Sequence, residues 1–239
     1  MFGYLLLGLA SSLLLFAAGV GSGLVMPTAA SAHQARSCLG GYDYGAINSA
    51  QFSDNEAKNR GTSATVSVVA PSKVSCQHIT SVYGLHGQGF FEFGYLIGFT
   101  NCNGNTHYYT KPVGFWTAVN SNGVWVGCGV FGGKTRPPAS SNHAFRASDI
   151  NRNYYWGAWY DGHEWQPNGV LMDFNSSRNA VSMERATSSD TGYAKFTDMS
   201  EYHDVNGWTH WDNIGTGTDA DPTYSPHYPN HHQAVYKHD

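Results

Sequence analysis

Charged side chains are scarce in this sequence: Asp, Glu, Lys and Arg together make up 13% of its 239 residues. The formal net charge of -4 at pH 7 leaves no basic surface that would attract phosphate groups, so we do not expect nucleic acid as a partner. Amphipathic helical periodicity is missing, and so is any internal repeat of fixed period. These absences exclude a helical protein, a repeat array and a nucleic-acid-binding domain.

The usual signatures of nucleophile and metal hydrolases are missing as well. No Gly-x-Ser-x-Gly elbow is present, and the cysteines show no Cys-x-x-Cys spacing that would hold zinc. Histidines are abundant toward the end of the chain, at 203–210 and 227–232, but their spacing matches no zincin pattern. We therefore expect neither a metal ion nor another cofactor.

The start of the chain lacks the positive charge that usually opens a signal peptide, because residues 1–4 contain no Lys or Arg. The apolar run 4–25 and the small residues 30–32 nevertheless form a pattern that a signal peptidase accepts, which predicts a signal peptide at 1–32. An uncleaved membrane anchor is the alternative, since the run is long enough to span a bilayer. Cleavage predicts a secreted, extracellular protein without stable membrane association.

Gly, Tyr, Trp, Ser, Thr and Asn are abundant, and this composition is typical of short strands joined by polar turns. After the signal peptide the chain is long enough for one all-β domain, which we expect to be a monomer. Breaker clusters indicate an N-terminal extension at 33–60 with room for one strand, and a β-sandwich domain at 61–214. The remaining residues, 215–239, are polar with almost no aliphatic side chain and predict a loose tail.

Short β-type runs alternate with turn signals along the predicted domain. Asn122 and Gly123 separate the runs 113–119 and 124–131 and predict a type I′ hairpin. Asp161–Gly162 repeats this turn chemistry farther along. Strands at such spacing without helices between them predict an antiparallel β-sandwich, of the jelly-roll or concanavalin-like kind.

Four cysteines follow the predicted cleavage site, and an exported protein can oxidise them to two disulfides. The sequence allows three connectivities. We favour Cys38 with Cys76 and Cys102 with Cys128, because the second pair would join neighbouring strands.

Glutamate occurs only five times, so a glutamate inside an apolar strand is conspicuous. In the run 90–99, the period of two places Glu92, Gly94 and Gly98 on one face, opposite a face of bulky residues that must belong to the core. The missing side chains at the two glycines leave room for the backbone of a substrate chain. Glu92 is therefore a candidate functional residue.

Glu184 lies in a similar strand, 180–186, where Ala180 and Ser182 share its face and larger residues oppose it. A single charged strand residue usually faces water. Two carboxyls in a partly desolvated groove, however, can hold different protonation states, so that one activates water and the other protonates an amide. The pair Glu92 and Glu184 could thus hydrolyse a peptide bond.

The order of motifs along the chain resembles that of the neprosin-type glutamic peptidases, secreted β-sandwich enzymes related in fold to the fungal glutamic peptidases. The segment 91–95 resembles the family's Ile-Glu-x-Gly-Trp, and 181–184 resembles its Val-x-Trp-Gly-Gly-Glu, with Tyr95 in place of Trp and Ser182–Met183 in place of Gly-Gly. Similar matches extend to three further segments: 62–71, 107–117 and 155–159. The resemblance implies that Glu92 and Glu184 are catalytic, that the substrate is a polypeptide and that cleavage occurs next to proline at acid pH.

Four aromatic residues are candidates for the substrate groove, because their flat apolar faces suit proline or sugar rings: Tyr95, Trp116, Trp156 and Trp159. Aromatic side chains also pack sandwich cores routinely. Two further hypotheses follow: a non-catalytic secreted module that binds glycans or cell walls through exposed aromatics, and a secreted structural protein. They differ from the peptidase hypothesis in not requiring the glutamates to converge.

Overall fold

The computed structural model describes most of the chain beyond the predicted signal peptide. The described residues are 42–48, 59–102, 104–131, 137–149, 153–165, 169–174, 178–185, 191–203, 206–212, 214–218 and 227–238. The predicted signal peptide at 1–32 and Cys38 lie outside these ranges. Within them, no helix is long and apolar enough to cross a membrane.

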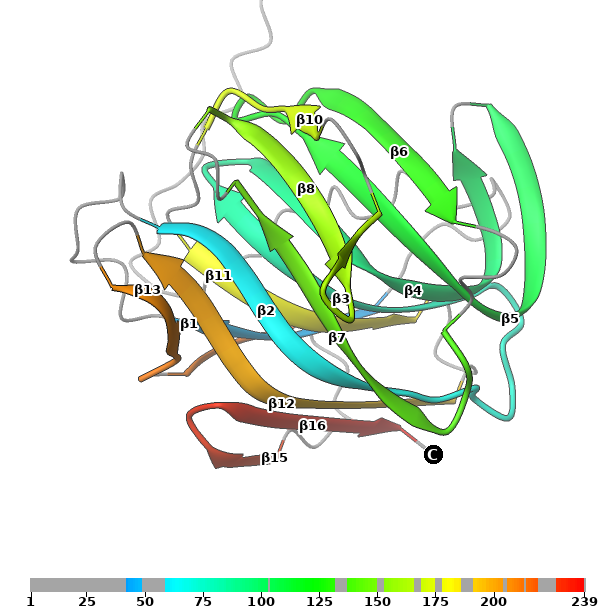
Figure 1. The fold of residues 1–239 in the computed structure, drawn as a ribbon. Coiled ribbons are helices and arrows are strands. Elements are labelled where there is room, and N and C mark those ends of the chain that lie inside the picture. The colour runs from blue at the N-terminus through cyan, green and yellow to red at the C-terminus, as the bar shows by residue number, and fades with distance from the viewer. Residues whose placement is uncertain are drawn as a thin grey trace, which may run out of the picture.

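The strands form two antiparallel sheets (Figure 1), which confirms the predicted all-β sandwich. In order across the first sheet they are β14 (Gly215–Thr218), β1 (Tyr42–Asn48), β11 (Arg178–Arg185), β3 (Gln77–His86), β4 (Gly89–Cys102), β5 (Asn105–Val119) and β6 (Trp125–Phe131). In order across the second they are β10 (Val170–Leu171), β8 (Tyr155–Tyr160), β7 (Ser141–Ser148), β2 (Asn59–Val68), β12 (Gly192–His203), β16 (Gln233–His238) and β15 (His227–Asn230). Two short strands pair at the side of this path: β9 (His163–Glu164) with β8 and β13 (Gly207–His210) with β12.

The core lies between the sheets and follows the predicted period of two. On β4 the bulky residues Phe91, Phe93 and Tyr95 are buried there, and on β11 so are Val181 and Met183. The alternate residues of the same strands, including both candidate glutamates, therefore lie on the face of the first sheet that is turned away from the second sheet. We call this the outer face.

The predicted hairpin turns are present. Gly123 connects β5 to β6 with φ of 79°, and its N–H donates to the Asn120 carbonyl at 2.9 Å. Asp161 and Gly162 connect β8 to β9 with φ of 47° and 81°. In the second turn both Asp161 and Gly162 adopt the left-handed conformation that the Asp-Gly pair favours. In the first turn only Gly123 does so, because Asn122 has no positive φ, so the predicted type I′ turn is wrong and the turn spans residues 120–123 instead.

The glycines of β4 have a different role from the predicted one. A Cβ on Gly94 would lie 2.1 Å from the Thr80 carbonyl oxygen, and one on Gly98 would lie 2.1 Å from the Cys76 carbonyl oxygen. The room beside them is filled by the protein's own backbone, so the expectation that a substrate chain uses it is wrong. At Gly98, with φ of 103°, the register with β5 also shifts, and Phe99 leaves the core and packs against Tyr108 instead.

Cys102 at the end of β4 forms the predicted disulfide with Cys128 on β6. Cys128 pairs in register with Thr117, which in turn pairs with Glu92. Residues that lie directly opposite one another share a face, so this disulfide belongs to the outer face. Cys76 is also disulfide-bonded, and its predicted partner lies outside the described residues.

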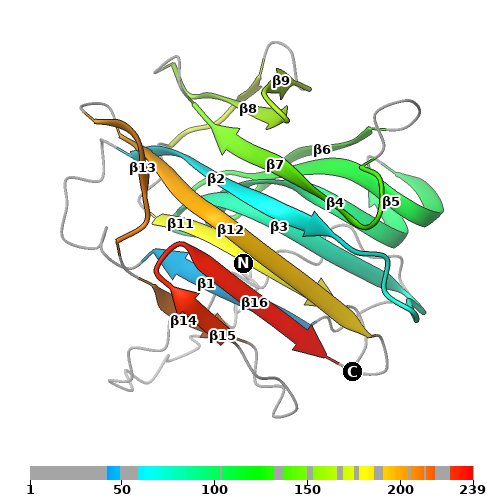
Figure 2. The ribbon, with the colours of Figure 1, turned by 60° about the horizontal axis from the view of Figure 1, so that its bottom comes forward.

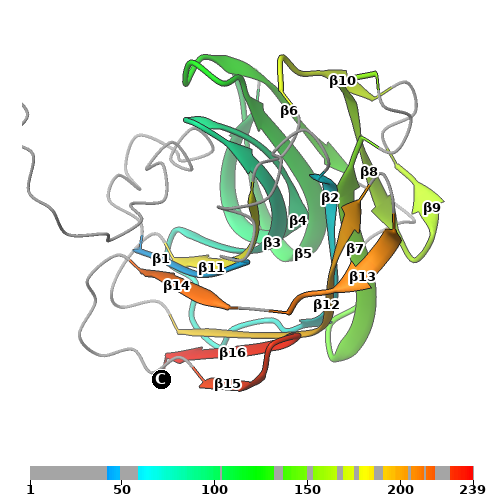
Figure 3. The ribbon, with the colours of Figure 1, turned by 90° about the vertical axis from the view of Figure 1, so that its left-hand side faces the viewer.

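The C-terminal residues differ from the predicted loose tail. β16 pairs along β12 in the second sheet (Figure 2), and Ala234 and Tyr236 are fully buried between the sheets. β14 pairs with β1, which in turn lies beside β11 (Figure 3). The prediction was wrong because a strand that alternates Ala, Tyr and polar residues needs few aliphatic side chains to bury one face.

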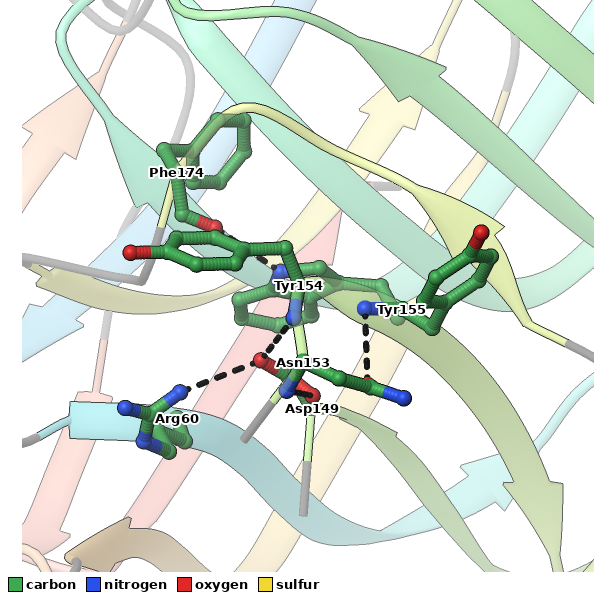
Figure 4. A network of polar contacts seen from close by, with 7 residues as sticks. Arg60, Asp149, Asn153, Tyr154, Tyr155 and Phe174 are labelled. Carbon is green, nitrogen blue, oxygen red and sulfur yellow. Dashed lines mark hydrogen bonds and ion pairs between the residues drawn. The ribbon is translucent and has the colours of Figure 1, made fainter. Parts of the chain in front are cut away.

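A polar network fixes the segment that leads from β7 into β8 (Figure 4). The Asp149 carboxylate accepts hydrogen bonds from the N–H groups of Asn153 at 3.2 Å and Tyr154 at 2.8 Å, and forms an ion pair with Arg60 of β2 at 3.1 Å. Tyr154 has φ of 64°, an unusual value for a residue with a side chain. The network therefore holds a strained turn and connects it to the neighbouring strand.

Candidate functional site

Three neighbouring strands carry the candidate site on the outer face. Glu92 of β4 lies directly opposite Tyr83 of β3 and Thr117 of β5. Glu184 lies on β11, on the other side of β3, where it pairs in register with Ile79. The two glutamates are therefore on strands that do not pair with each other, and β3 runs between them.

Tyr83 connects the two glutamates. Its hydroxyl oxygen lies 2.8 Å from Glu92 Oε1 and 2.5 Å from Glu184 Oε1. Ser182 Oγ donates a third hydrogen bond to the same oxygen at 2.9 Å, and Ser81 Oγ lies 3.4 Å from Ser182 Oγ. The structure thus brings Glu92 and Glu184 together around one phenol group.

The surroundings favour a protonated Glu92. Its burial raises its pKa well above the ordinary value, and the nearby negative charge of Glu184 raises the pKa further. Hydrogen bonds that Tyr83, Ser81 and Thr117 donate to the ionised carboxylate act in the opposite direction but are outweighed. Glu92 is 0% exposed and Glu184 is 8% exposed, so Glu184 keeps some contact with solvent.

The number of hydrogen atoms indicates independently that one of the two carboxyls is protonated. A phenol oxygen has one hydrogen to donate and two lone pairs that can accept. Because Ser182 donates to it, Tyr83 can donate to one carboxyl and accept from one other group. If both Glu92 and Glu184 were ionised, one of them would face the phenol oxygen without any hydrogen between them. The arrangement is satisfied when one of the two glutamates is protonated.

Apolar side chains flank these polar groups on the outer face. One buried cluster contains Tyr83 itself with Leu85, Phe90, Val119 and Ala180, and another contains Ile79, Leu96, Val113 and Phe115. An apolar environment strengthens electrostatic interactions between the groups that it surrounds. The site can therefore hold two carboxyls in different protonation states at the same pH.

The second sheet supports the site from behind. Thr62 of β2 donates a hydrogen bond to the backbone carbonyl oxygen of Tyr83, and its Oγ1 lies 2.5 Å from Asn179 Oδ1 on β11. Asn179 Nδ2 donates to Glu201 of β12 at 3.2 Å, and Glu201 pairs with His203 at 2.9 Å. This buried chain of polar groups fixes β3 and β11 relative to the second sheet.

The four aromatic groove candidates do not lie at this site. Tyr95 and Trp156 are fully buried in the core between the sheets, and Trp116 packs against the same core. Trp159 stacks under the Arg146 guanidinium, 4.1 Å from its ring centroid, on the second sheet. The prediction was wrong because it weighted the size of the aromatic rings above the face on which the period of two places them.

Sequence reasoning missed Tyr83, Ser81 and Thr117. The period of two does place Tyr83 and Ser81 on one face of a strand, but it does not reveal which strand lies beside it. Only the register between β3 and β4 brings Tyr83 opposite Glu92. Ser182, which stands where the family has a glycine, donates a hydrogen bond to Tyr83.

Within the part of the chain that the structure describes, no group of three or more His, Cys, Asp or Glu side chains is arranged to hold a metal ion. The polar groups at the outer-face site are two carboxyls, a phenol and small hydroxyls. These groups can transfer protons and orient water.

Comparison with family models and with curated proteins finds no match to this sequence. Among solved structures, the chain is similar to scytalido-glutamic peptidase bound to a peptide-based transition-state analogue, with a TM-score of 0.53 and 12% identity over 82% of this chain and 98% of that chain. It is also similar to SCP-B, a member of the eqolisin family of peptidases bound to the tripeptide Ala-Ile-His, with a TM-score of 0.51, 12% identity and the same coverage of 82% and 98%. The chain thus has the fold of the glutamic peptidases.

Proposed function

We propose that this protein is a glutamic-type endopeptidase in which Glu92 is the general acid and Glu184 the general base. The observation that carries the proposal is the Tyr83 hydroxyl within hydrogen-bond distance of both carboxyls, which requires one shared proton in the pair. Glu92 is the protonated member because it is fully buried and its pKa is raised. Glu184 is the ionised member because it keeps contact with solvent.

The reaction follows from these protonation states. Glu184 takes a proton from a water molecule as its oxygen bonds to the scissile carbonyl carbon, while Glu92 gives its proton to the carbonyl oxygen. In the second step Glu184 returns its proton to the leaving nitrogen and the C–N bond breaks. Glu92 recovers a proton from one hydroxyl of the intermediate, which becomes the product carboxyl. Both glutamates are then in their starting states.

The fold supports this proposal, since the similar peptidases SCP-B and scytalido-glutamic peptidase bind a tripeptide and a peptide-based analogue respectively. A polypeptide substrate is therefore the natural choice. We further propose that the protein acts outside the cell, where the Cys102–Cys128 disulfide is stable. Membership of the neprosin-type branch and cleavage next to proline stay predictions of the sequence resemblance.

The test is cleavage of a denatured, proline-containing protein by the purified mature chain from acid to neutral pH. Glu92→Gln and Glu184→Gln keep the side-chain shape but cannot exchange a proton, so each is expected to lower kcat by about 10² to 10⁴-fold. Glu164→Gln is the matched control, because Glu164 is exposed on β9 of the second sheet. It should cleave like the unchanged protein.

Two results would contradict the proposal. The first is the absence of cleavage by the folded and fully processed wild-type chain at every pH, which would favour the non-catalytic binding module. The second is full activity in either glutamate variant.

A further inference from the structure

We propose that Tyr83 is a positioning residue of the site, whose hydroxyl donates its hydrogen to whichever glutamate is ionised and accepts a hydrogen bond from the protonated one. This inference rests on the proposed peptidase function and adds a third participant to it. The geometry points to this role because one oxygen lies within hydrogen-bond distance of both carboxyls.

The position of Tyr83 is fixed from several sides. Its side chain is 4% exposed, and its ring meets the edge of Phe90 with centroids 5.9 Å apart. Thr62 from the second sheet holds its backbone carbonyl, and Ser182 donates to its hydroxyl. Only the hydroxyl hydrogen has freedom to rotate, so the phenol oxygen stays between the glutamates while its donor direction changes.

The reaction requires such a change of direction. Before the water attacks, Glu184 is ionised and receives the Tyr83 hydrogen, while the protonated Glu92 donates to the phenol oxygen. After the first step Glu184 holds a proton and Glu92 is ionised, so both hydrogen bonds reverse. No proton leaves Tyr83 at any point, and rotation of one O–H bond follows the charge from one carboxyl to the other.

Titratable residues on several strands face this arrangement. Among the described side chains of the strands around it, the titratable groups that the phenol contacts are Glu92 of β4 and Glu184 of β11. Thr117 lies opposite Glu92 on β5, and Cys128 on β6 is held in its disulfide. On β1, Asp43 is the residue that pairs in register with Glu184. The pH profile of kcat therefore tests the two glutamates through their common partner, Tyr83.

Removing the phenol hydroxyl should shift the pH dependence in a defined direction. While Glu184 is ionised it holds the Tyr83 hydrogen, so the phenol oxygen accepts from Glu92 and favours its protonated form. Loss of the hydroxyl therefore lowers the pKa of Glu92. In the proposed mechanism the fall of kcat at high pH reports the loss of the proton from the acid Glu92. In Tyr83→Phe this descending limb should therefore move to lower pH.

The experiment compares kcat, KM and the pH profile of kcat in the wild-type chain and in Tyr83→Phe. We expect kcat to fall by about 10- to 100-fold, the value of one hydrogen bond to a charged group, with little change in KM. The descending limb should move to lower pH by about one unit. Tyr95→Phe is the matched control, because Tyr95 is a fully buried tyrosine of the same sheet whose hydroxyl accepts from the Val69 N–H on the opposite face. It should leave the pH profile unchanged.

The possible failures are distinguishable. A wild-type chain without cleavage contradicts the peptidase function itself. Wild-type cleavage together with an unshifted profile in Tyr83→Phe overturns the role of Tyr83 and leaves the function intact, and so does an equal shift in Tyr95→Phe. If Tyr83→Phe does not fold, Ser182→Ala gives the same test, since it removes a donor to the phenol oxygen. It should lower kcat by about threefold or more and shift the descending limb, and an unchanged profile overturns the proposal.

Discussion

Glu92 and Glu184 share one hydrogen-bond partner, although the strands that carry them do not pair with each other. The strand between them, β3, supplies that partner from its Tyr83. The site thus depends on the register of three strands at once. A slip of one residue in either pairing would turn a glutamate toward the core and separate the pair.

The first prediction concerns the free energy of unfolding of Glu92→Gln as a function of pH. The pKa of Glu92 in the folded state lies above its ordinary value of 4.5, so its favourable contribution is fully present below that value and is lost as pH rises through the folded pKa. Gln is neutral at every pH, so the variant does not lose this contribution to the free energy of unfolding as the pH rises. Below about pH 4 the difference in free energy of unfolding between the variant and the wild type should be nearly constant. Above that pH the variant should become more stable relative to the wild type by about 1.4 kcal/mol for each pH unit, until the pKa of Glu92 in the folded protein is passed.

Urea unfolding at a series of pH values measures this difference. Glu164→Gln serves as the control, since the exposed Glu164 carboxyl should give no gain that grows with pH. A constant difference between Glu92→Gln and the wild type from acid to neutral pH would show that folding does not raise the pKa of Glu92.

Much of this site follows from the period of two alone. That period separates Glu92 from the core residues Phe91 and Phe93, and Glu184 from Val181 and Met183, without any knowledge of the fold. Turn chemistry at Asn122–Gly123 likewise predicts which strands form a hairpin, because the dipeptide accepts a backbone that few others do.

What the sequence could not predict depends on contacts between distant segments. Tyr83 and Glu184 are 101 residues apart, and nothing local to either indicates their contact. The pairing of β16 with β12 likewise could not be predicted from the sequence, since it depends on which edge the rest of the sheet leaves open. The bulge at Gly98 also required the structure, because the period of two continues through it in the sequence and breaks in the fold.

A second prediction concerns the close approach of β3 and β4. A Cβ on Gly94 would lie 2.1 Å from the Thr80 carbonyl oxygen and 2.6 Å from Ser81 Cα, and this backbone cannot move without displacing β3. We expect Gly94→Ala to lower the free energy of unfolding by about 3 kcal/mol, measured by urea titration. It should also lower cleavage, because Ser81 and its strand neighbour Tyr83 would shift.

Gly127→Ala is the comparison for this variant. Its Cβ would lie 3.3 Å from the far end of the Trp116 side chain, which can give way. We expect Gly127→Ala to lower the free energy of unfolding by less than about 1 kcal/mol. Equal losses in the two variants would show that β3 and β4 are not in close contact at Gly94.

A third prediction concerns the turn held by Asp149. In Asp149→Asn one of the two carboxylate oxygens becomes an NH₂ group, which cannot accept either the hydrogen bond from Asn153 N–H to Oδ1 or those from Tyr154 N–H and Arg60 to Oδ2, and the negative charge that pairs with Arg60 is lost. Because Asp149 is 0% exposed, water does not replace the lost acceptor. We expect the free energy of unfolding at neutral pH to fall by about 2 kcal/mol, measured by urea titration.

Asp173→Asn is the matched control for Asp149→Asn. The Asp173 carboxylate also accepts two hydrogen bonds, from Ser121 N–H at 2.9 Å and Ser121 Oγ at 2.6 Å, but it lies in an exposed position. Water can take the place of the carboxylate oxygen that becomes an NH₂ group, so the free energy of unfolding should fall by only about 0.5 kcal/mol. A larger loss for Asp173→Asn than for Asp149→Asn would contradict the importance assigned to the buried turn.

The last prediction connects the Cys102–Cys128 disulfide to the site. The bond closes a loop of 26 residues and holds the end of β4, beyond the bulge at Gly98, on the face that carries Glu92. A Cys102→Ser/Cys128→Ser double variant should lose about 3 kcal/mol of unfolding free energy, since its unfolded chain is less constrained. It should also cleave about tenfold more slowly at a temperature where it is fully folded, because the strands around Glu92 are held less firmly. Circular dichroism at the assay temperature verifies the fold. A double variant that is less stable yet cleaves at the wild-type rate would show that the disulfide stabilises the sandwich without organising the site.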